Sequence, residues 1–374
     1  MKAALALLLC LFMALTTANG ETLMNTFTPT WNNVKPLGRT HQLEDSLWLA
    51  FSGTGAEFTA HCTRLDVVMA ADSRFADPAN QCRIAIEVNG QRVVDDMLNA
   101  AEKTYSVWQS DTAEEITVRV IKLSETAMST CGIKAIVTDA EAILPTAKKA
   151  HAIEFIGDSI TCGYGADDEV AEHPFATSTE NVTHSYAYKT AQALDADYSM
   201  VSISGYGIIS GYTGTGESKV TSQLLPTYYE KLGFSYGQYQ GQTPADVAWD
   251  FSAYTPDLIV INLGTNDDSY TGDDPERQED YRAQYTEFLK VVRRNNPDAK
   301  ILCTLGIMGD RLYPQVEKAV AAYTEETGDT NIACMKFAMQ LYADGYAADW
   351  HPSQKTHTKA SQKLVKEIQQ LMGW

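Results

Sequence analysis

Residues 151–165, H-A-I-E-F-I-G-D-S-I-T-C-G-Y-G, decide the fold that we expect for the second half of this chain. Within them, residues 152–156 form an apolar run typical of a buried strand, and Gly157-Asp158-Ser159 ends that run abruptly. A residue that follows a buried parallel strand lies at the carboxyl edge of its sheet, where α/β proteins usually place their active sites. We therefore expect Ser159 to lie in an active site.

Similar strands recur through residues 146–374, where they alternate with helical stretches. The expected strands are residues 152–156, 199–203, 258–263, 300–305 and 331–335. Apolar residues at spacings of three and four predict a helix with its buried face at residues 281–292 and a last helix from residue 358. Parallel strands joined by helices form a three-layer α/β domain. Residues 206–254 have weak periodicity, which predicts a long irregular segment.

The first half of the chain has the pattern of an all-β domain, which we place at residues 21–145. Short runs rich in Val, Ile, Thr and aromatic residues are separated by turns, at residues 48–51, 57–59, 65–69, 83–88, 103–108 and 115–122. Asn89-Gly90 between two of these runs predicts a β-hairpin. Several strands at roughly ten-residue spacing favour a β-sandwich of the jelly-roll type.

Residues 1–20 are typical of a secretory signal peptide. Lys2 precedes an apolar run at residues 3–15, and the small residues Ala18 and Gly20 suit a cleavage site. We therefore expect a protein secreted to the periplasm or the extracellular space, with no membrane partner. The formal net charge of −19 argues against nucleic acid and anionic membranes, because both bind positive surfaces.

The cysteine pattern predicts neither a zinc ribbon nor a thioredoxin-type redox site. Of the seven cysteines, six follow the expected signal peptide, and none lies in a C-x-x-C pair. Their pairing stays open, although Cys303 lies in an apolar run typical of a buried thiol. There is no H-E-x-x-H or phosphate-binding loop motif, so we expect no metal and no cofactor.

Four residues at or near the ends of apolar runs form a candidate catalytic set: Ser159, Gly205, Asn266 and His351. Taken singly, each has an ordinary structural explanation. A glycine after a strand usually makes a turn, an asparagine in a G-T-N-D turn often caps its own backbone, and a histidine beside a proline is usually a surface residue. The four together, at the ends of strands that share one sheet edge, favour a common site.

The chemistry of ester hydrolysis requires these residue types. A serine hydroxyl is a weak nucleophile that needs a base within hydrogen-bond reach, and His351 can take that role for Ser159. Asp349 can orient the imidazole, although it could instead cap the segment before the last helix. The N–H groups of Ser159 and Gly205 and the Asn266 amide can stabilise an oxyanion, each donor being worth about 3–4 kcal/mol.

These motifs resemble those of a known family. The matching blocks are G-D-S-I-T at residues 157–161, Gly205, G-T-N-D at residues 264–267 and D-W-H-P at residues 349–352. They are similar to the four blocks of the SGNH (GDSL) hydrolases. Gly38-Arg39-Thr40 and W-D-F-S at residues 249–252 extend the resemblance to carbohydrate esterase family 2, whose members carry a jelly-roll domain before the SGNH domain.

The resemblance implies a serine esterase that removes O-acetyl groups from plant-wall polysaccharides or oligosaccharides, with a leaning to the 6-position of hexoses. It implies that Trp350 stacks on the sugar, and that the site is either a Ser–His dyad or a triad completed by Asp349. Other aromatic residues of the irregular segment could contact sugar or simply pack. Two alternatives remain: a general short-chain lipase or esterase, for which Ile208-Ile209 is the only hint of a lid, and a carbohydrate-binding protein with weak hydrolysis.

Overall fold

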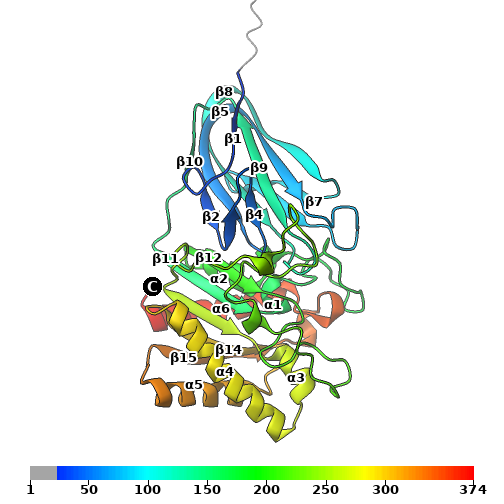
Figure 1. Ribbon diagram of the computed structural model, residues 1–374, viewed down its shortest axis with the longest axis vertical. Coiled ribbons are helices and arrows are strands. Elements are labelled where there is room, and N and C mark those ends of the chain that lie inside the picture. The colour runs from blue at the N-terminus through cyan, green and yellow to red at the C-terminus, as the bar shows by residue number, and fades with distance from the viewer. Residues whose placement is uncertain (1–22) are drawn as a thin grey trace, which may run out of the picture.

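The computed structural model describes residues 23–374, which form an antiparallel sheet followed in the chain by a parallel sheet with helices on both faces (Figure 1). The expected signal peptide lies outside the described residues. Among residues 23–374, no helix combines the length and apolar character needed to cross a membrane.

The antiparallel sheet contains ten strands, and the longest path through it has the order β3-β4-β9-β5-β8-β6-β7. The strands are β1 (Asn25–Phe27), β2 (Lys35–Leu37), β3 (Thr40–Gln42), β4 (Leu47–Leu49), β5 (Gly55–Ala71), β6 (Arg83–Val88), β7 (Gln91–Met97), β8 (Glu102–Lys122), β9 (Cys131–Thr138) and β10 (Ile143–Pro145). Strands β2 and β10 pair with β5, and β1 pairs with β9. Every one of these pairings is antiparallel.

Two long strands, β5 and β8, join both layers of this β-sandwich. The first part of β5 pairs with the last part of β8 beside β6, and register shifts near Cys62 and Leu65 lead into the part that pairs with β9. Side chains of both layers, such as Ile86 and Ile133, share one buried core. The sequence predicted two separate short strands where the structure has one long strand, both in β5 and in β8. In β8 the middle of the strand is polar and exposed, which explains why the apolar pattern is interrupted there.

The hairpin predicted at Asn89-Gly90 is confirmed. Strands β6 and β7 pair directly across these two residues, which have φ angles of 51° and 78°. Both values are positive, as a two-residue type I′ turn requires. The local turn chemistry therefore determines the register of this edge of the sandwich.

The parallel sheet has the strand order β12-β11-β13-β14-β15 and follows the predicted runs closely. Its strands are β11 (His151–Gly157), β12 (Ala196–Ser202), β13 (Leu258–Asn262), β14 (Lys300–Ile307) and β15 (Ile332–Met339). Strands β11 and β13 are nearly fully buried, as expected for a parallel sheet covered on both faces. Their carboxyl ends meet at one edge, which is where the site residues lie.

Helices cover both faces of this sheet. They are α1 (Ser159–Cys162), α2 (Tyr186–Ala193), α3 (Thr265–Thr271), α4 (Pro275–Asn295), α5 (Tyr313–Thr327) and α6 (Gln354–Met372). Helices α4 and α5 pack on one face, and α2 and α6 pack on the other. The predicted apolar face of α4 is buried, whereas α6 begins at Gln354, before the predicted start, because Ser353 caps it.

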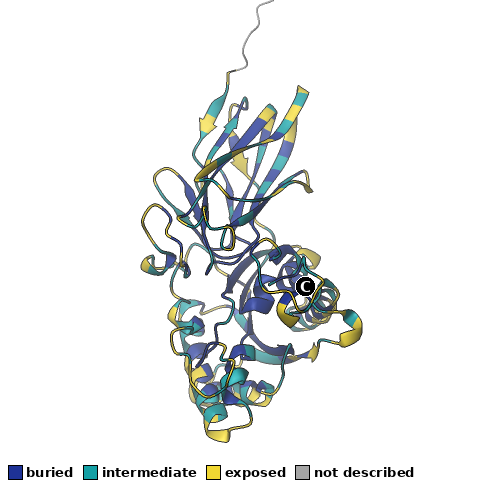
Figure 2. Ribbon diagram, turned by 90° about the vertical axis from the view of Figure 1, so that its right-hand side faces the viewer, coloured by how far each residue is buried: buried dark blue, intermediate teal, exposed yellow. Residues whose placement is uncertain are grey.

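The predicted irregular segment, residues 206–254, contains only short 3₁₀ turns at Leu225–Thr227 and Pro244–Asp246. Parts of it, such as Tyr229 and Tyr239, are nevertheless buried. Figure 2 shows buried stretches along the strands of both halves and exposed stretches on the outer loops. Tyr239 stacks on Trp48 of the β-sandwich, with ring centroids 5.6 Å apart. The segment therefore fills the space between the two sheets.

Two sequence blocks of the resemblance meet at this junction. Arg39, from the first block, is fully buried and donates two hydrogen bonds to the Glu154 carboxylate on β11, at 3.1 and 3.2 Å. Its guanidinium lies 5.3 Å from the ring of Trp249 and 5.1 Å from that of Phe251, both in the second block. This buried contact joins the halves of the chain, and we propose a domain division at residue 145, between β10 and β11.

Candidate active site

The four candidate residues converge at the carboxyl edge of the parallel sheet. Ser159 begins α1 after β11, Gly205 follows β12, Asn266 lies in the first turn of α3 after β13, and His351 follows the 3₁₀ turn Ala348–Trp350. They line a cavity of about 600 Å³. Its other lining residues are Glu125, Met128, Tyr164, Phe175, Ser204, Tyr212, Thr265, Met308, Asp349 and Trp350.

Ser159 and His351 form the central pair of the cavity. His351 Nε2 lies 2.9 Å from Ser159 Oγ, which is the distance of a good hydrogen bond. Burial lowers the pKa of His351 to about 4, although the nearby charge of Asp349 acts in the opposite direction. The imidazole is therefore neutral at neutral pH, and its Nε2 can accept the serine proton.

The second imidazole nitrogen contacts a backbone carbonyl. His351 Nδ1 lies 3.1 Å from the carbonyl oxygen of Asp349, so a proton on Nδ1 is donated there and Nε2 is left as an acceptor. The Asp349 carboxylate instead accepts a hydrogen bond from Tyr164 Oη at 3.0 Å. Asp349 thus occupies the position expected of a triad acid, but its main chain makes the contact that the sequence suggested for its side chain.

The loop before His351 has unusual backbone geometry. Asp349 and Trp350 have φ angles of 55° and 59°, in the left-handed region that costs a residue with a side chain about 1–2 kcal/mol. Gly165 packs against this loop, and a Cβ there would lie only 2.7 Å from the Cβ of Ala348. Glycine at position 165 therefore permits the close approach of the histidine loop to the turn after α1.

The three residues expected to donate to an oxyanion, Ser159, Gly205 and Asn266, all line the cavity. The Ser159 N–H belongs to the first turn of α1, where backbone N–H groups have no acceptor within the helix. Gly205 has a φ of 81°, which glycine adopts at little cost. Asn266 Nδ2 donates to the Tyr206 carbonyl at 2.9 Å, while its 3.4 Å contact with Asp158 Oδ2 is at the long limit of a hydrogen bond. One amide proton of Asn266 is thus only weakly engaged.

Trp350 is half-exposed at the rim of the cavity, with 51% of its surface accessible. Of the tyrosines in residues 206–254, only Tyr212 lines the cavity, whereas others such as Tyr229 and Tyr239 are buried in the core. Ile208 and Ile209 are also buried, so they form part of the core and not a lid.

Sequence reasoning missed Tyr164 and Phe175. The Tyr164 ring stacks on the His351 ring with centroids 3.9 Å apart, and Phe175 lies against Tyr164 at 4.3 Å. The three rings hold the imidazole in one orientation. Tyr164 stands in the quoted stretch, beside the glycine turn, but nothing in its spacing indicates contact with a residue near the end of the chain.

Sequence reasoning also missed Glu125 and Met128, which come from the loop after β8 and line the cavity. Buried Glu125 accepts a hydrogen bond from the Ser204 N–H at 2.9 Å, next to Gly205. The Glu125 N–H donates to Glu180 at 2.8 Å, and Lys122 Nζ donates to the Glu125 carbonyl at 2.7 Å. The β-sandwich thus helps to shape the catalytic cavity.

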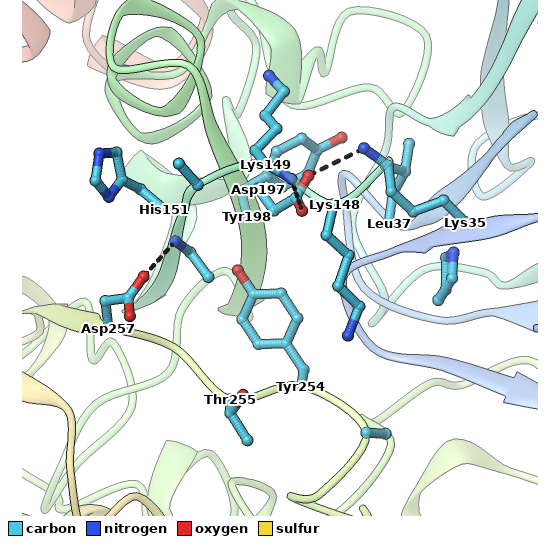
Figure 3. Close-up of a pocket in the computed structure, with 14 residues that line it drawn as sticks. Lys35, Leu37, Lys148, Lys149, His151, Asp197, Tyr198, Tyr254, Thr255 and Asp257 are labelled. Carbon is cyan, nitrogen blue, oxygen red and sulfur yellow. Dashed lines mark hydrogen bonds and ion pairs between the residues drawn. The ribbon is translucent and has the colours of Figure 1, made fainter. Parts of the chain in front are cut away.

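A second cavity, of about 210 Å³, lies at the opposite edge of the parallel sheet (Figure 3). Lys35 and Asp197 face each other there at 3.1 Å, and Asp257 binds the Ala152 N–H at 2.8 Å. None of the candidate catalytic residues lines it. Lys35, Asp197 and Asp257 are engaged within the protein, and no serine or cysteine lines this cavity, so it offers no such nucleophile for acyl transfer.

The fold and the first cavity define a class of protein. A serine with a neutral histidine at 2.9 Å, placed at the carboxyl edge of a three-layer α/β sheet, is the arrangement of a serine hydrolase. Ser159, the expected nucleophile, lies at the beginning of α1. Such a site performs acyl transfer.

Comparisons with known proteins identify the family. Residues 155–359 match the GDSL-like Lipase/Acylhydrolase family, and residues 37–146 match the Carbohydrate esterase 2 N-terminal family. The chain therefore belongs to the GDSL-like hydrolases and, within them, to carbohydrate esterase family 2. It is a serine carboxylic-ester hydrolase of the carbohydrate acetyl esterase type, as the motifs predicted.

Individual relatives agree with this assignment. An acetylxylan esterase / glucomannan deacetylase of Cellvibrio japonicus is 32% identical over 68% of this chain and 69% of its own length. The cellulase/esterase CelE of Acetivibrio thermocellus is 36% identical over 59% of this chain, which matches only 26% of that larger protein. A family two carbohydrate esterase from Clostridium thermocellum, solved with cellohexaose, is 28% identical with a TM-score of 0.79, over 91% of this chain and 99% of that one.

Proposed function

We propose that this protein removes O-acetyl groups from the sugars of plant-wall polysaccharides or oligosaccharides, with Ser159 as nucleophile and His351 as general base. The observation that carries the proposal is the 2.9 Å Ser159–His351 pair in a cavity whose rim presents Trp350. Aromatic rings pack well against the C–H faces of sugars. The names of relatives, which include an acetylxylan esterase / glucomannan deacetylase, support the same substrate class.

The reaction follows from the geometry. Ser159 Oγ attacks the acetyl carbon while His351 Nε2 takes the serine proton, and the donors of Ser159, Gly205 and Asn266 stabilise the oxyanion. The imidazolium then protonates the departing sugar oxygen, which leaves an acetyl-serine. Water, deprotonated by the same imidazole, attacks this ester and releases acetate. The Asp349 carbonyl keeps the proton on Nδ1 throughout, so we propose a Ser–His dyad.

The depth of the serine favours acetyl groups at the 6-position of hexoses. Ser159 is only 7% exposed, whereas the proposed sugar platform, Trp350, is 51% exposed at the rim. A sugar ring on Trp350 must therefore send its acetyl group inward. An ester on the exocyclic C6 extends further from the ring than an ester on a ring carbon, so it meets this requirement best.

Acetate release tests the proposal directly. Wild-type protein and a Ser159→Ala variant are compared on acetylated glucomannan, acetylated xylan and acetylated monosaccharides. We expect release by wild type, fastest from 6-O-acetylated hexoses, and a loss of at least about 10³-fold in the variant. Ser110→Ala, which changes a partly exposed serine of β8 outside the cavity, is the matched control. Retained activity in Ser159→Ala would falsify the serine mechanism.

An acyl-chain series separates the alternatives. A deacetylase loses activity steeply from acetyl to octanoyl esters of one alcohol, whereas a general short-chain lipase or esterase keeps or gains it. Tight glycan binding without acetate release would instead indicate a carbohydrate-binding protein.

We also propose export by a signal peptide at residues 1–20. N-terminal sequencing of the mature protein from the culture fluid or periplasm tests that step.

A further inference from the structure

A row of aromatic rings leads away from the active-site cavity over the protein surface. It consists of Trp350, Tyr346 and Tyr342, which we call the aromatic strip. The ring centroids of Trp350 and Tyr346 are 5.4 Å apart, and those of Tyr346 and Tyr342 are 6.3 Å apart. Trp350 belongs both to the strip and to the cavity lining. The strip is therefore continuous with the catalytic site.

The exposure of the two outer rings is not explained by the fold, whereas Tyr346 between them is partly buried. Tyr342 is 86% exposed and Trp350 is 51% exposed, and the neighbouring Leu341 is 54% exposed. Single exposed apolar residues are ordinary, but a contiguous group beside a cavity usually marks a binding surface. In the irregular segment, by contrast, Tyr206, Tyr229 and Tyr239 are buried in the core.

Polar contacts attach the loop that carries the strip to helix α6 and its N-cap. The carboxylate of Asp344, which directly follows Tyr342-Ala343, pairs with Lys355 at 2.9 Å and with Lys359 at 2.6 Å on α6. Ser353 Oγ donates to the Asp344 carbonyl at 2.8 Å. Tyr346 forms an antiparallel bridge with Pro352, beside the catalytic histidine. A pre-positioned surface loses little conformational entropy when it binds a ligand.

We propose that the aromatic strip binds the glycan chain on one side of the acetylated sugar, with Tyr346 and Tyr342 each supporting a successive sugar residue. The proposal rests on the proposed function, because it takes Trp350 as the platform for the reacting sugar. The three rings of the strip carry no charge, so the strip offers no ionic contact that would select a charged chain. Its ligand is a neutral polysaccharide.

The ring planes indicate the physical form of that polysaccharide. Trp350 and Tyr346 are inclined at 57° to each other, and Tyr346 and Tyr342 at 63°. A flat crystalline surface cannot contact three rings inclined in this way. A single chain in solution can twist from one ring to the next. The strip therefore suits soluble glucan or mannan chains and not crystalline cellulose.

The test compares a polymer with a small ester in the full-length protein. Tyr342→Ala should lower kcat/KM on soluble acetylated glucomannan by about 2- to 10-fold, mainly through KM, given the usual energy of one aromatic contact. Its kcat/KM on 4-nitrophenyl acetate should not change. Tyr342→Phe should retain most of the polymer activity. Trp31→Ala, a half-exposed aromatic of the β-sandwich, should change neither rate.

Binding without catalysis separates this proposal from the proposed function. In a Ser159→Ala background, calorimetric titration with unacetylated soluble glucomannan should show weaker binding after Tyr342→Ala, whether or not acetate is the natural product. The proposal would be contradicted if Tyr342→Ala left both the glucomannan affinity and the polymer KM unchanged. It would also be contradicted if this variant lowered kcat/KM equally on the polymer and on the small ester. A shift from dimer to monomer in Tyr342→Ala, with unchanged glycan affinity, would show instead that the strip contacts a second copy of the chain.

Discussion

At the scale of single residues, the site depends on which atom of Asp349 faces the histidine. The carbonyl oxygen lies 3.1 Å from His351 Nδ1, and the carboxylate is held by Tyr164. The residue identity in D-W-H-P could be read from the sequence, but the choice between carbonyl and carboxylate could not. It depends on the left-handed backbone of Asp349 and Trp350, which no local pattern encodes.

Asp349→Asn tests the role of the carboxylate. Asparagine tolerates the left-handed conformation as well as aspartate does, so the loop and its carbonyl should stay in place. We expect kcat to fall by less than about 10-fold, far below the roughly 10⁴-fold loss that follows when a true triad aspartate is replaced. Steady-state kinetics on a small acetyl ester decide the question. A fall in kcat of about 10³-fold with an unchanged melting temperature would show that the Asp349 carboxylate acts as the third member of a triad.

The acid limb of the pH profile reports on His351. Burial lowers the pKa of His351 from its usual 6.5 to about 4, so the base loses its function only when pH falls through that value. The activity kcat/KM should therefore rise between about pH 3 and 5 and then level off. The Asp349 charge raises this pKa, so Asp349→Asn should move the limb to lower pH. Tryptophan fluorescence at each pH controls for unfolding, and a limb centred near 6.5 would contradict the burial argument.

At the scale of elements, the spacing of apolar residues along the chain predicted most of the helices and strands. The strands of the parallel sheet could be predicted because both faces of the sheet are buried, so their side chains are mostly apolar. The loop after β8 was not recognised as functional. Glu125 stands in an ordinary polar turn of the sequence, and its contact with Ser204 joins residues 79 positions apart. Only the packing of the two sheets creates that contact.

We predict that Glu125 positions the loop after β12, whose Gly205 N–H is a proposed oxyanion donor. Glu125→Ala removes the acceptor of the Ser204 N–H and should let Gly205 move, so we expect kcat to fall about 10- to 100-fold with little change in KM, a part of the loss that follows removal of an oxyanion donor. Glu125→Gln keeps an acceptor oxygen and should retain activity within about 3-fold.

Val118→Ala provides the control, because it opens a cavity in the β-sandwich core away from the loop. It should lower the melting temperature and leave kcat unchanged. Equal losses in Glu125→Gln and Glu125→Ala would show that the charge of Glu125 matters and not its hydrogen bond.

At the scale of the whole molecule, the β-sandwich and the α/β layers are joined by buried polar contacts. Arg39 and Glu154 lie in different halves of the chain, and both are almost fully buried. The sequence showed that Gly38-Arg39-Thr40 and residues 249–252 belong to the family pattern, but not that they touch. The contact arises because the irregular segment folds back between the sheets and places two aromatic rings against the guanidinium.

Arg39→Met tests how strongly this contact joins the two halves. Methionine fills much of the space but leaves the Glu154 carboxylate buried without its partner, which usually costs about 3–5 kcal/mol. We expect a clear fall in the denaturant midpoint and the melting temperature. Arg39→Met combined with Glu154→Gln removes the unpaired charge and should recover part of that loss. Arg294→Ala breaks an exposed pair with Glu230, 62% and 47% accessible, and should change stability by less than about 1 kcal/mol. If Arg39→Met is as stable as Arg294→Ala, the two halves are held together by apolar packing alone.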